Sequence, residues 1–174
     1  MSQQRVVETI AILEEAMRNE IQGRRFYLAA AKRTSDLRGQ ELFRSIADDE
    51  TDHYRLLKTQ REGISQGRPW VSLEEAKALP RYNISIFPVV DDIPIRENAA
   101  DTDALRIAMD YERRGYDLYD RAAASAEDPT AKEIFRFLAG EENRHFVLLQ
   151  ENYNYLTTGG SWLFDDWEKP IFEG

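Results

Sequence analysis

The chain has 174 residues, enough for one domain whose core folds without disulfide support. It contains no cysteine, which excludes disulfides, thiol catalysis, zinc ribbons and cysteine-ligated iron centres, so any metal must be held by oxygen and imidazole. The formal net charge of −9 argues against nucleic acids and anionic membranes as partners, because both require clustered Lys and Arg, and it favours cations.

Apolar residues recur with helical spacing in four long segments, which we expect to be helices over about residues 6–33, 38–62, 102–126 and 129–155. The fourth is expected to begin at Pro129, because Asp128 is a preferred N-cap residue and proline suits the first helical position. In the third helix the apolar face is expected to include Leu105, Tyr116 and Tyr119. Each apolar face also carries a glutamate, so polar atoms are predicted to point into the core.

The links between these helices predict the topology. Short connections near 34–37 and 127–129 indicate two antiparallel helix hairpins. The middle segment, about 63–100, holds four of the six prolines, with a brief helical pattern at 72–79 and an extended stretch at 84–90. It is too long for a tight turn and suits a connection along the length of a bundle. We therefore expect an all-α four-helix bundle, built from two antiparallel hairpins joined by a long crossover.

We assign residues 1–160 to a single domain and treat 161–174 as an aromatic C-terminal tail. The tail is expected to pack against the bundle or against a second subunit. The N-terminus leads into a helix that polar residues interrupt, and no apolar stretch approaches the length of a membrane span. A cytoplasmic protein is the default expectation.

Residues of the types that bind metals occur twice in the chain at one constant displacement of 92 positions. The surrounding sequence repeats with them: 40–57 and 132–149 share eight of eighteen residues, and 16–31 and 108–123 share seven of sixteen. This is an internal duplication. The repeated candidate ligands are Glu20, Glu50 and His53 in the first half and Glu112, Glu142 and His145 in the second.

Both histidines lie in the pattern E-x-x-H, which places a carboxylate and an imidazole on the same helix face. Two such helices, together with two helices that each supply one glutamate, can form a dinuclear metal site. Four buried carboxylates must share protons or bind cations, and two divalent ions neutralise them. Three ligands for each metal, if the carboxylates divide evenly, leave open positions for water, oxygen or peroxide. Such an oxygen-rich set suits iron or manganese better than zinc.

Two further repeated pairs lie beside the candidate ligands. Tyr27 and Tyr119 follow the single glutamates by two helical turns, so they are either hydrogen-bond donors or radical sinks next to the metal site, or ordinary core aromatics. Gly23 and Gly115 follow the same glutamates by three residues. Glycine inside a helix costs about 1 kcal/mol relative to alanine, so this pair indicates close helix approach or space for a small ligand.

The six candidate ligands and the long crossover resemble those of the ferritin-like di-iron carboxylate proteins, most closely the rubrerythrin branch, over roughly residues 5–157. The resemblance implies a ferritin-like fold in which these residues bind two iron ions, or manganese or a mixed pair. It also implies reduction of hydrogen peroxide as the metals cycle between diferrous and diferric states, and a homodimer. Rubrerythrins usually carry an extra glutamate one turn after the third-helix ligand, where this chain has Gly115. The rubredoxin-like domain of that family is also missing, which implies an external electron donor such as a rubredoxin-type protein.

The leading hypothesis is therefore a rubrerythrin-like oxidoreductase that reduces hydrogen peroxide or oxygen with external electrons. A ferroxidase or iron-handling protein would use the same site and fits the acidic composition. A dimanganese catalase is a second enzyme alternative. A non-catalytic protein that keeps the metals for stability is the third, since two cations could hold four helices together.

Overall fold

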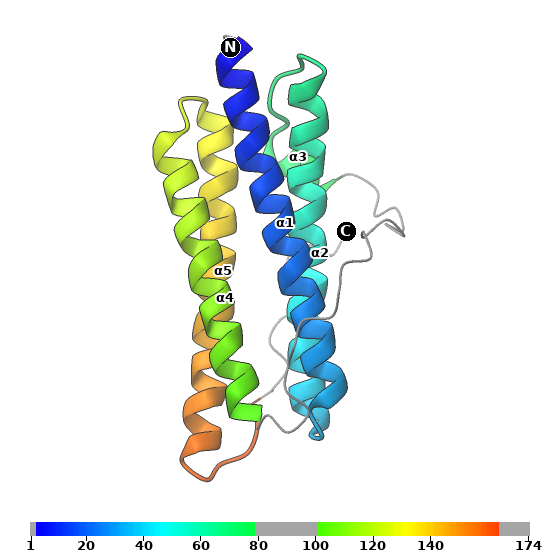
Figure 1. Ribbon diagram of the computed structural model, residues 1–174, viewed down its shortest axis with the longest axis vertical. Coiled ribbons are helices and arrows are strands. Elements are labelled where there is room, and N and C mark those ends of the chain that lie inside the picture. Colours follow the sequence, from blue (N-terminus) through cyan, green and yellow to red (C-terminus); the bar gives the residue numbers. More distant parts are fainter. Residues whose placement is uncertain (1–2, 79–100, 164–174) are drawn as a thin grey trace.

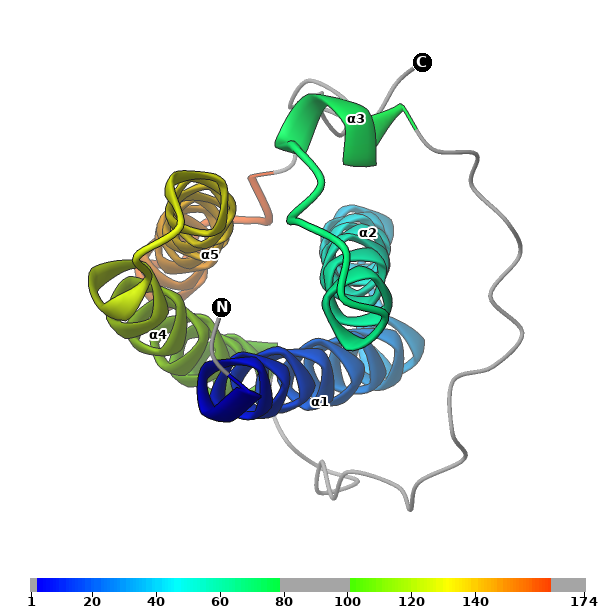
Figure 2. The same cartoon turned by 90° about the horizontal axis from the view of Figure 1, so that it is seen from above.

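The computed structural model describes residues 3–78 and 101–163 and has the expected all-α architecture of two antiparallel hairpins (Figure 1). The helices are α1 (Gln3–Arg33), α2 (Leu37–Ser65), the short α3 (Leu73–Lys77), α4 (Asp101–Ser125) and α5 (Pro129–Thr157). α1 pairs with α2 and α4 with α5, and α1 lies beside α4 (Figure 2). The extended stretch expected at 84–90 lies outside the described residues. Within the described ranges, no helix is both long and apolar enough to cross a membrane.

Matching N-caps begin the second helix of each hairpin. The carboxylate of Asp36 accepts a hydrogen bond from the backbone N–H of Arg38 at 2.9 Å. The carboxylate of Asp128, 92 positions later, accepts from the N–H groups of Thr130 and Ala131, as the sequence predicted. Because such caps satisfy N–H groups that have no partner in the helix, α2 and α5 can begin directly after a short turn.

A tight turn after α2 brings Trp70 back onto the bundle. Gly67 has a φ of 73°, a left-handed conformation that glycine adopts without steric cost. The buried side-chain amide of Gln60 then fixes Val71, accepting from its N–H at 2.9 Å and donating to its carbonyl at 3.0 Å. The ring of Trp70 consequently packs edge-on against Phe135 of α5, with 5.8 Å between ring centroids.

The segment after α5 repeats this arrangement 92 positions later, at the opposite end of the bundle. The buried amide oxygen of Asn152 accepts from the N–H of Leu163 at 2.8 Å. Trp162 packs edge-on against Phe43 of α2, with 5.7 Å between centroids, and only 3% of its surface is exposed. At the start of the tail, Trp162 thus packs on the bundle, one of the two outcomes expected. Residues 164–174 lie outside the described part of the chain.

The apolar core consists of two clusters, one at each end of the bundle. One surrounds Trp70 and Phe135, and the other surrounds Trp162 and Phe43. On every long helix the candidate metal ligands fall in sequence between residues of one cluster and residues of the other. The core is therefore interrupted at mid-height by a layer of polar side chains.

Periodicity predicted that Tyr116 lies in the core, and this prediction is wrong. Tyr116 is 40% exposed, whereas Gly115 is buried. The buried face of α4 steps from Glu112 to Gly115 and then to Tyr119, so it follows the three-then-four spacing of tightly paired helices. On this buried face of α4, Gly115 lies against α5, and Tyr116 lies at the edge of the face.

Gly39 permits the close packing of Trp162 on α2, and its replacement should destabilise the fold. A Cβ atom at position 39 would lie 2.6 Å from the indole Cε2 of Trp162. We expect Gly39→Ala to lower the free energy of unfolding in urea by about 1–3 kcal/mol, the usual cost of overpacking. Gly140→Ala is the matched control, because a Cβ there would meet nothing within 4 Å. It should stabilise by up to about 1 kcal/mol through helix propensity, and equal effects of the two substitutions would contradict this account.

Candidate metal centre

The six predicted ligand residues converge in the polar layer between the two apolar clusters. None is more than 3% exposed. Glu20 comes from α1, Glu50 and His53 from α2, Glu112 from α4, and Glu142 and His145 from α5. Each of the four long helices therefore supplies at least one of them, and a single layer in the middle of the bundle contains four carboxyl groups and two imidazoles.

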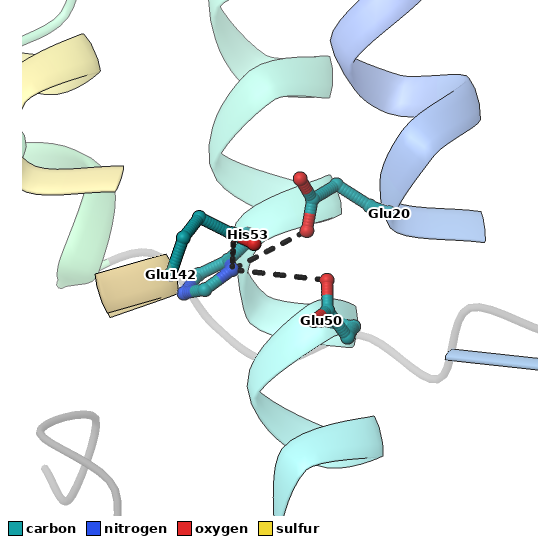
Figure 3. A group of neighbouring side chains, drawn as sticks. All are labelled: Glu20, Glu50, His53 and Glu142. Carbon is teal, nitrogen blue, oxygen red and sulfur yellow. Dashed lines mark ion pairs between the residues drawn. The ribbon is translucent and has the colours of Figure 1, made fainter. Parts of the chain in front are cut away.

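The first group of candidate ligands surrounds His53 (Figure 3). The Nδ1 atom of His53 lies 3.3 Å from Glu20 Oε2 and 3.6 Å from Glu142 Oε1. The same nitrogen lies 4.0 Å from Glu50 Oε2. Three helices thus direct carboxylate oxygens towards one imidazole nitrogen.

The second group surrounds His145 and shares a member with the first. The Nδ1 atom of His145 lies 3.5 Å from Glu112 Oε2 and 4.0 Å from Glu50 Oε1. Glu50 therefore directs one oxygen towards each histidine and belongs to both groups. The six candidate ligands therefore do not divide into two separate sets of three, which an even division between two metals would require. Instead, Glu50 is common to both groups and could help to hold either cation.

Several donor atoms of these groups lack hydrogen-bond partners. Within the described residues, the unpaired buried atoms of the site include Glu20 Oε2, Glu112 Oε2, Glu142 Oε1, His53 Nδ1 and His145 Nδ1. A buried polar atom left unpaired costs about 1–3 kcal/mol, and native structures rarely leave one so. Cations bound between these atoms would satisfy all of them. The donor set thus fits two metal ions, and its oxygen-rich character suits iron or manganese.

Tyr27 and Tyr119 position the two single glutamates. The hydroxyl of Tyr27 donates a hydrogen bond to Glu112 Oε1, and that of Tyr119 donates to Glu20 Oε1. Burial, followed by the charge of the glutamate that each phenol contacts, holds the pKa of both phenols well above the usual value, so both remain donors. Each bond crosses between α1 and α4 and leaves the Oε2 atom of the glutamate facing the histidine of its group. Of the two alternatives, the structure supports the hydrogen-bond donor.

Asp49 is a residue of the site that the sequence reasoning missed. Its Oδ2 atom lies 3.0 Å from His145 Nε2, so it can fix the ring while Nδ1 faces the carboxylates. Burial lowers the pKa of His145, but Glu112 and Asp49 outweigh it and raise this pKa to about 10. The repeat counterpart of Asp49 is the buried Glu141, which pairs with Arg144 at 2.6 Å instead. An acidic residue immediately precedes each E-x-x-H motif in the sequence, and this repeated pattern could have revealed Asp49 and Glu141.

Gly23 and Gly115 make room for the carboxylates of the two E-x-x-H motifs. A Cβ at position 23 would lie 3.3 Å from Glu50 Cδ, and one at position 115 would lie 2.9 Å from Glu142 Cδ. The paired glycines therefore serve close packing within each hairpin, and carboxyl groups occupy the adjacent space. A glutamate at position 115 would need the volume that Glu142 fills.

Without metal, the site holds protons. Burial raises the pKa of Glu50 well above the usual value, and the charges of Glu20 and Glu142 raise it further. Burial and the charges of Glu112 and Glu20 do the same to the pKa of Glu142. Because metal ligation requires deprotonated carboxylates, metal binding must displace these protons.

The stability of the metal-free protein should fall as the pH rises. The pKa of His145 is about 10 in the folded state against 6.5 normally, so this group stabilises fully below pH 6.5, and its contribution is lost between pH 6.5 and 10. The raised pKa values of Glu50 and Glu142 act in the same direction. We expect the free energy of unfolding to decrease across this range, by at most about 1.4 kcal/mol per pH unit for each group. Urea unfolding at several pH values, with and without metal, measures this decrease. The metal-loaded protein should not show it. A metal-free protein whose stability rises with pH would refute these pKa shifts.

Gly115→Ala should weaken metal binding more than Gly23→Ala, because the new methyl group would displace the Glu142 carboxylate. We expect a loss of about 10–100-fold in Mn²⁺ affinity, the usual effect of disturbing the support of a ligand. Calorimetric titration measures it. Gly140→Ala, which adds a methyl group that meets nothing within 4 Å, should leave the affinity unchanged. Equal affinities for all three variants would show that the glycine contacts do not position the ligands.

Comparison with known proteins agrees with this geometry. The rubrerythrin family model matches residues 11–153, a range that includes all six candidate ligands. No curated protein matches the chain. Among solved structures, a hypothetical protein from Pyrococcus furiosus is 22% identical, with a TM-score of 0.66, covering 88% of this chain and 93% of that one.

A second similar structure, from Anabaena variabilis, is a two-domain protein containing DJ-1/ThiJ/PfpI-like and ferritin-like domains. It is 16% identical with a TM-score of 0.65, and the match covers 97% of this chain but only 41% of that one. At these identities the two structures support the ferritin-like fold alone. The family match extends over most of the sequence and over the whole metal-ligand constellation, and the chain therefore belongs to the rubrerythrin family.

Proposed function

We propose that the protein reduces hydrogen peroxide, or dioxygen, at two iron ions held by the six residues of the candidate metal centre. The observation that carries the proposal is the pair of histidine-centred groups whose unpaired donor atoms converge on Glu50. Each peroxide consumes two electrons and two protons and gives two waters. These 174 residues contain no cysteine, and we propose that the electrons come from an external donor of the rubredoxin type.

Bound iron would supply one-electron redox chemistry at each position and open coordination sites for the oxidant. The protein side chains prepare the site for it. Tyr27 and Tyr119 hold Glu112 and Glu20 by one oxygen, so that the other oxygen remains directed inwards. Asp49 fixes the ring of His145. Because the ligands are almost fully buried, bulk water is excluded from the reaction.

A groove between α1 and α4 supports access for a small oxidant. Its volume is about 420 Å³, and its lining includes Asn19, the neighbour of Glu20, and Arg114, the neighbour of Gly115. A Cβ at position 115 would lie 3.3 Å from the amide nitrogen of Asn19 and 2.9 Å from Glu142 Cδ. Asn19, which lines this groove, therefore lies close to Gly115 and to a candidate ligand.

Gly115 bears on how the reaction is carried out. The close approach of Glu142 leaves no room for a seventh ligand at this position. We therefore propose that six protein ligands carry the chemistry, without an exchange between a histidine and an extra glutamate. Glu50, which faces both histidines, would help to hold both ions.

Anaerobic stopped-flow mixing of the iron(II)-loaded protein with hydrogen peroxide tests the proposal. We expect oxidation of two irons per chain, at a rate well above that of free ferrous ion. Glu50→Gln should slow this step by at least about tenfold, equivalent to about 1.4 kcal/mol of activation free energy. Glu41→Gln, at an exposed position on the same helix, is the matched control and should react like the parent protein.

Three results would count against the proposed function. Oxidation no faster than that of free ferrous ion would rule out the proposed reductase activity. Release of oxygen from peroxide without any reductant, by manganese-loaded protein, would favour a catalase. Consumption of dioxygen with retention of a ferric mineral would favour iron handling.

A further inference from the structure

Three aromatic side chains form a continuous path from a surface cavity to the candidate metal centre. Trp70 contacts Phe135 edge-on, with 5.8 Å between ring centroids. Phe135 stacks on Tyr119 at 6.4 Å, and the Tyr119 hydroxyl donates to Glu20 Oε1. Both spacings fall within the range of direct aromatic contact. We call this path the Trp70 relay.

The duplication produces the same path a second time. Trp162 contacts Phe43 edge-on at 5.7 Å, Phe43 stacks on Tyr27 at 6.2 Å, and the Tyr27 hydroxyl donates to Glu112. Each member of this Trp162 relay lies 92 positions from its counterpart in the Trp70 relay. The interplanar angles also agree, at 75° and 77° for the edge contacts and 23° and 26° for the stacks. Order and geometry are thus both repeated.

The order of residue types in each relay matches one-electron transfer. Tryptophan and tyrosine are the two aromatic side chains that lose an electron most readily, and they occupy the outer and inner ends. Phenylalanine, which resists oxidation, serves only as the contact between them. Oxidation of a buried tyrosine also requires a proton acceptor, and each phenol already donates its hydrogen bond to a carboxylate of the metal centre.

We propose that these relays conduct single electrons from the surface of the protein to the candidate metal centre. The inference rests on the proposed function for its oxidant, which is the peroxide reduced there. Tyr119 gives up an electron to the centre and its proton to Glu20. Trp70 returns an electron to Tyr119, and the proton moves back. A one-electron donor in solution then reduces Trp70, so each pass oxidises one donor molecule, and two passes supply the electrons for one peroxide.

The two outer ends differ in accessibility. Trp70 and Phe135 line an open cavity of about 370 Å³, whose rim carries Arg5 and Glu127. Trp162 instead lies directly on the backbone of α2 at Gly39. The repeat counterpart of Gly39 is Ala131, whose methyl group lines the cavity beside Trp70. Among the described residues, the outer end of the Trp70 relay thus lines a cavity, and we take this cavity as the place where an external donor meets the relay.

Photochemical oxidation of the metal-free protein tests the relay without any reaction of iron, by driving the electron exchange between Trp70 and Tyr119 in the reverse direction through the same contacts. The chain has no cysteine, so Ser125→Cys, at an exposed position lining the cavity, accepts a single ruthenium photo-oxidant. After a laser flash in the presence of a quencher, transient absorption should show a tryptophan radical that decays into a tyrosyl radical. In the added variant Tyr119→Phe, the tyrosyl signal should be lost and the tryptophan radical should live at least about tenfold longer, a difference of about 1.4 kcal/mol in activation free energy.

Two further variants define the path. Phe135→Leu should slow the transfer while the tryptophan radical still forms, and Trp70→Phe should abolish both radicals. Tyr116→Phe, an exposed tyrosine on the same helix as Tyr119, is the matched control and should change nothing. Circular dichroism shows whether each variant is folded. A tryptophan radical with the same lifetime in folded Tyr119→Phe protein would overturn the relay.

The test separates the relay from the proposed function. If the radical moves from Trp70 to Tyr119 but iron-loaded protein does not react with peroxide, the relay stands and the peroxide assignment falls. If peroxide is reduced rapidly but no radical transfer occurs, electrons enter by another route and the inference is wrong.

Discussion

The burial of four carboxyl groups and two imidazoles in the middle of a helical bundle is the constraint on which the rest of this structure depends. Moving an ionised group out of water costs several kcal/mol, and attraction between neighbours repays this only with good geometry and satisfied hydrogen bonds. Here several donor atoms lack such bonds and face one another. The fold therefore carries the cost of burying several carboxylates. Bound protons reduce this cost in part, and two bound cations would neutralise all four carboxylates. A bundle selected only for stability would place apolar residues in this layer.

Other features of the fold follow from this layer. Glycine lies beside both E-x-x-H carboxylates, because a methyl group would crowd Glu50 and would overlap with Glu142. Tyrosine lies two turns beyond each single glutamate, where a phenol combines a large apolar ring for the core with a hydroxyl donor at its tip. The apolar core is divided into two clusters, so neither hairpin has one uninterrupted hydrophobic seam. Apolar packing at the two ends of the bundle offsets the cost of burying polar groups at its centre.

Periodicity and the duplication predicted the helices, the hairpins and the six converging residues, because these features depend on spacing that can be read locally. The repeated pair Trp70 and Trp162, which lies beyond the aligned windows, was missed, although the two residues share the same displacement. Their contacts depend on turns after α2 and α5, which helical periodicity does not describe. Tyr116 was misplaced because a strict helical period does not show which of two adjacent positions faces the neighbouring helix. The shared position of Glu50 needed three-dimensional geometry, since sequence alone cannot assign the two oxygens of one carboxylate.

The hydrogen bonds between tyrosine and glutamate all cross from one hairpin to the other, and so does the contact of Glu142 with His53. Neither hairpin therefore contains a complete site, because each one supplies ligands and a tyrosine donor that the other hairpin needs. Two identical hairpins related by a twofold axis would complete one another in the same way, with a self-complementary interface. Joining them in one chain makes this association intramolecular, so the effective concentration of one half for the other is fixed by the connecting segment rather than by the amount of protein. Within one chain the two halves also need not be identical, and they differ at Asp49 and Glu141, which make different contacts around the two histidines.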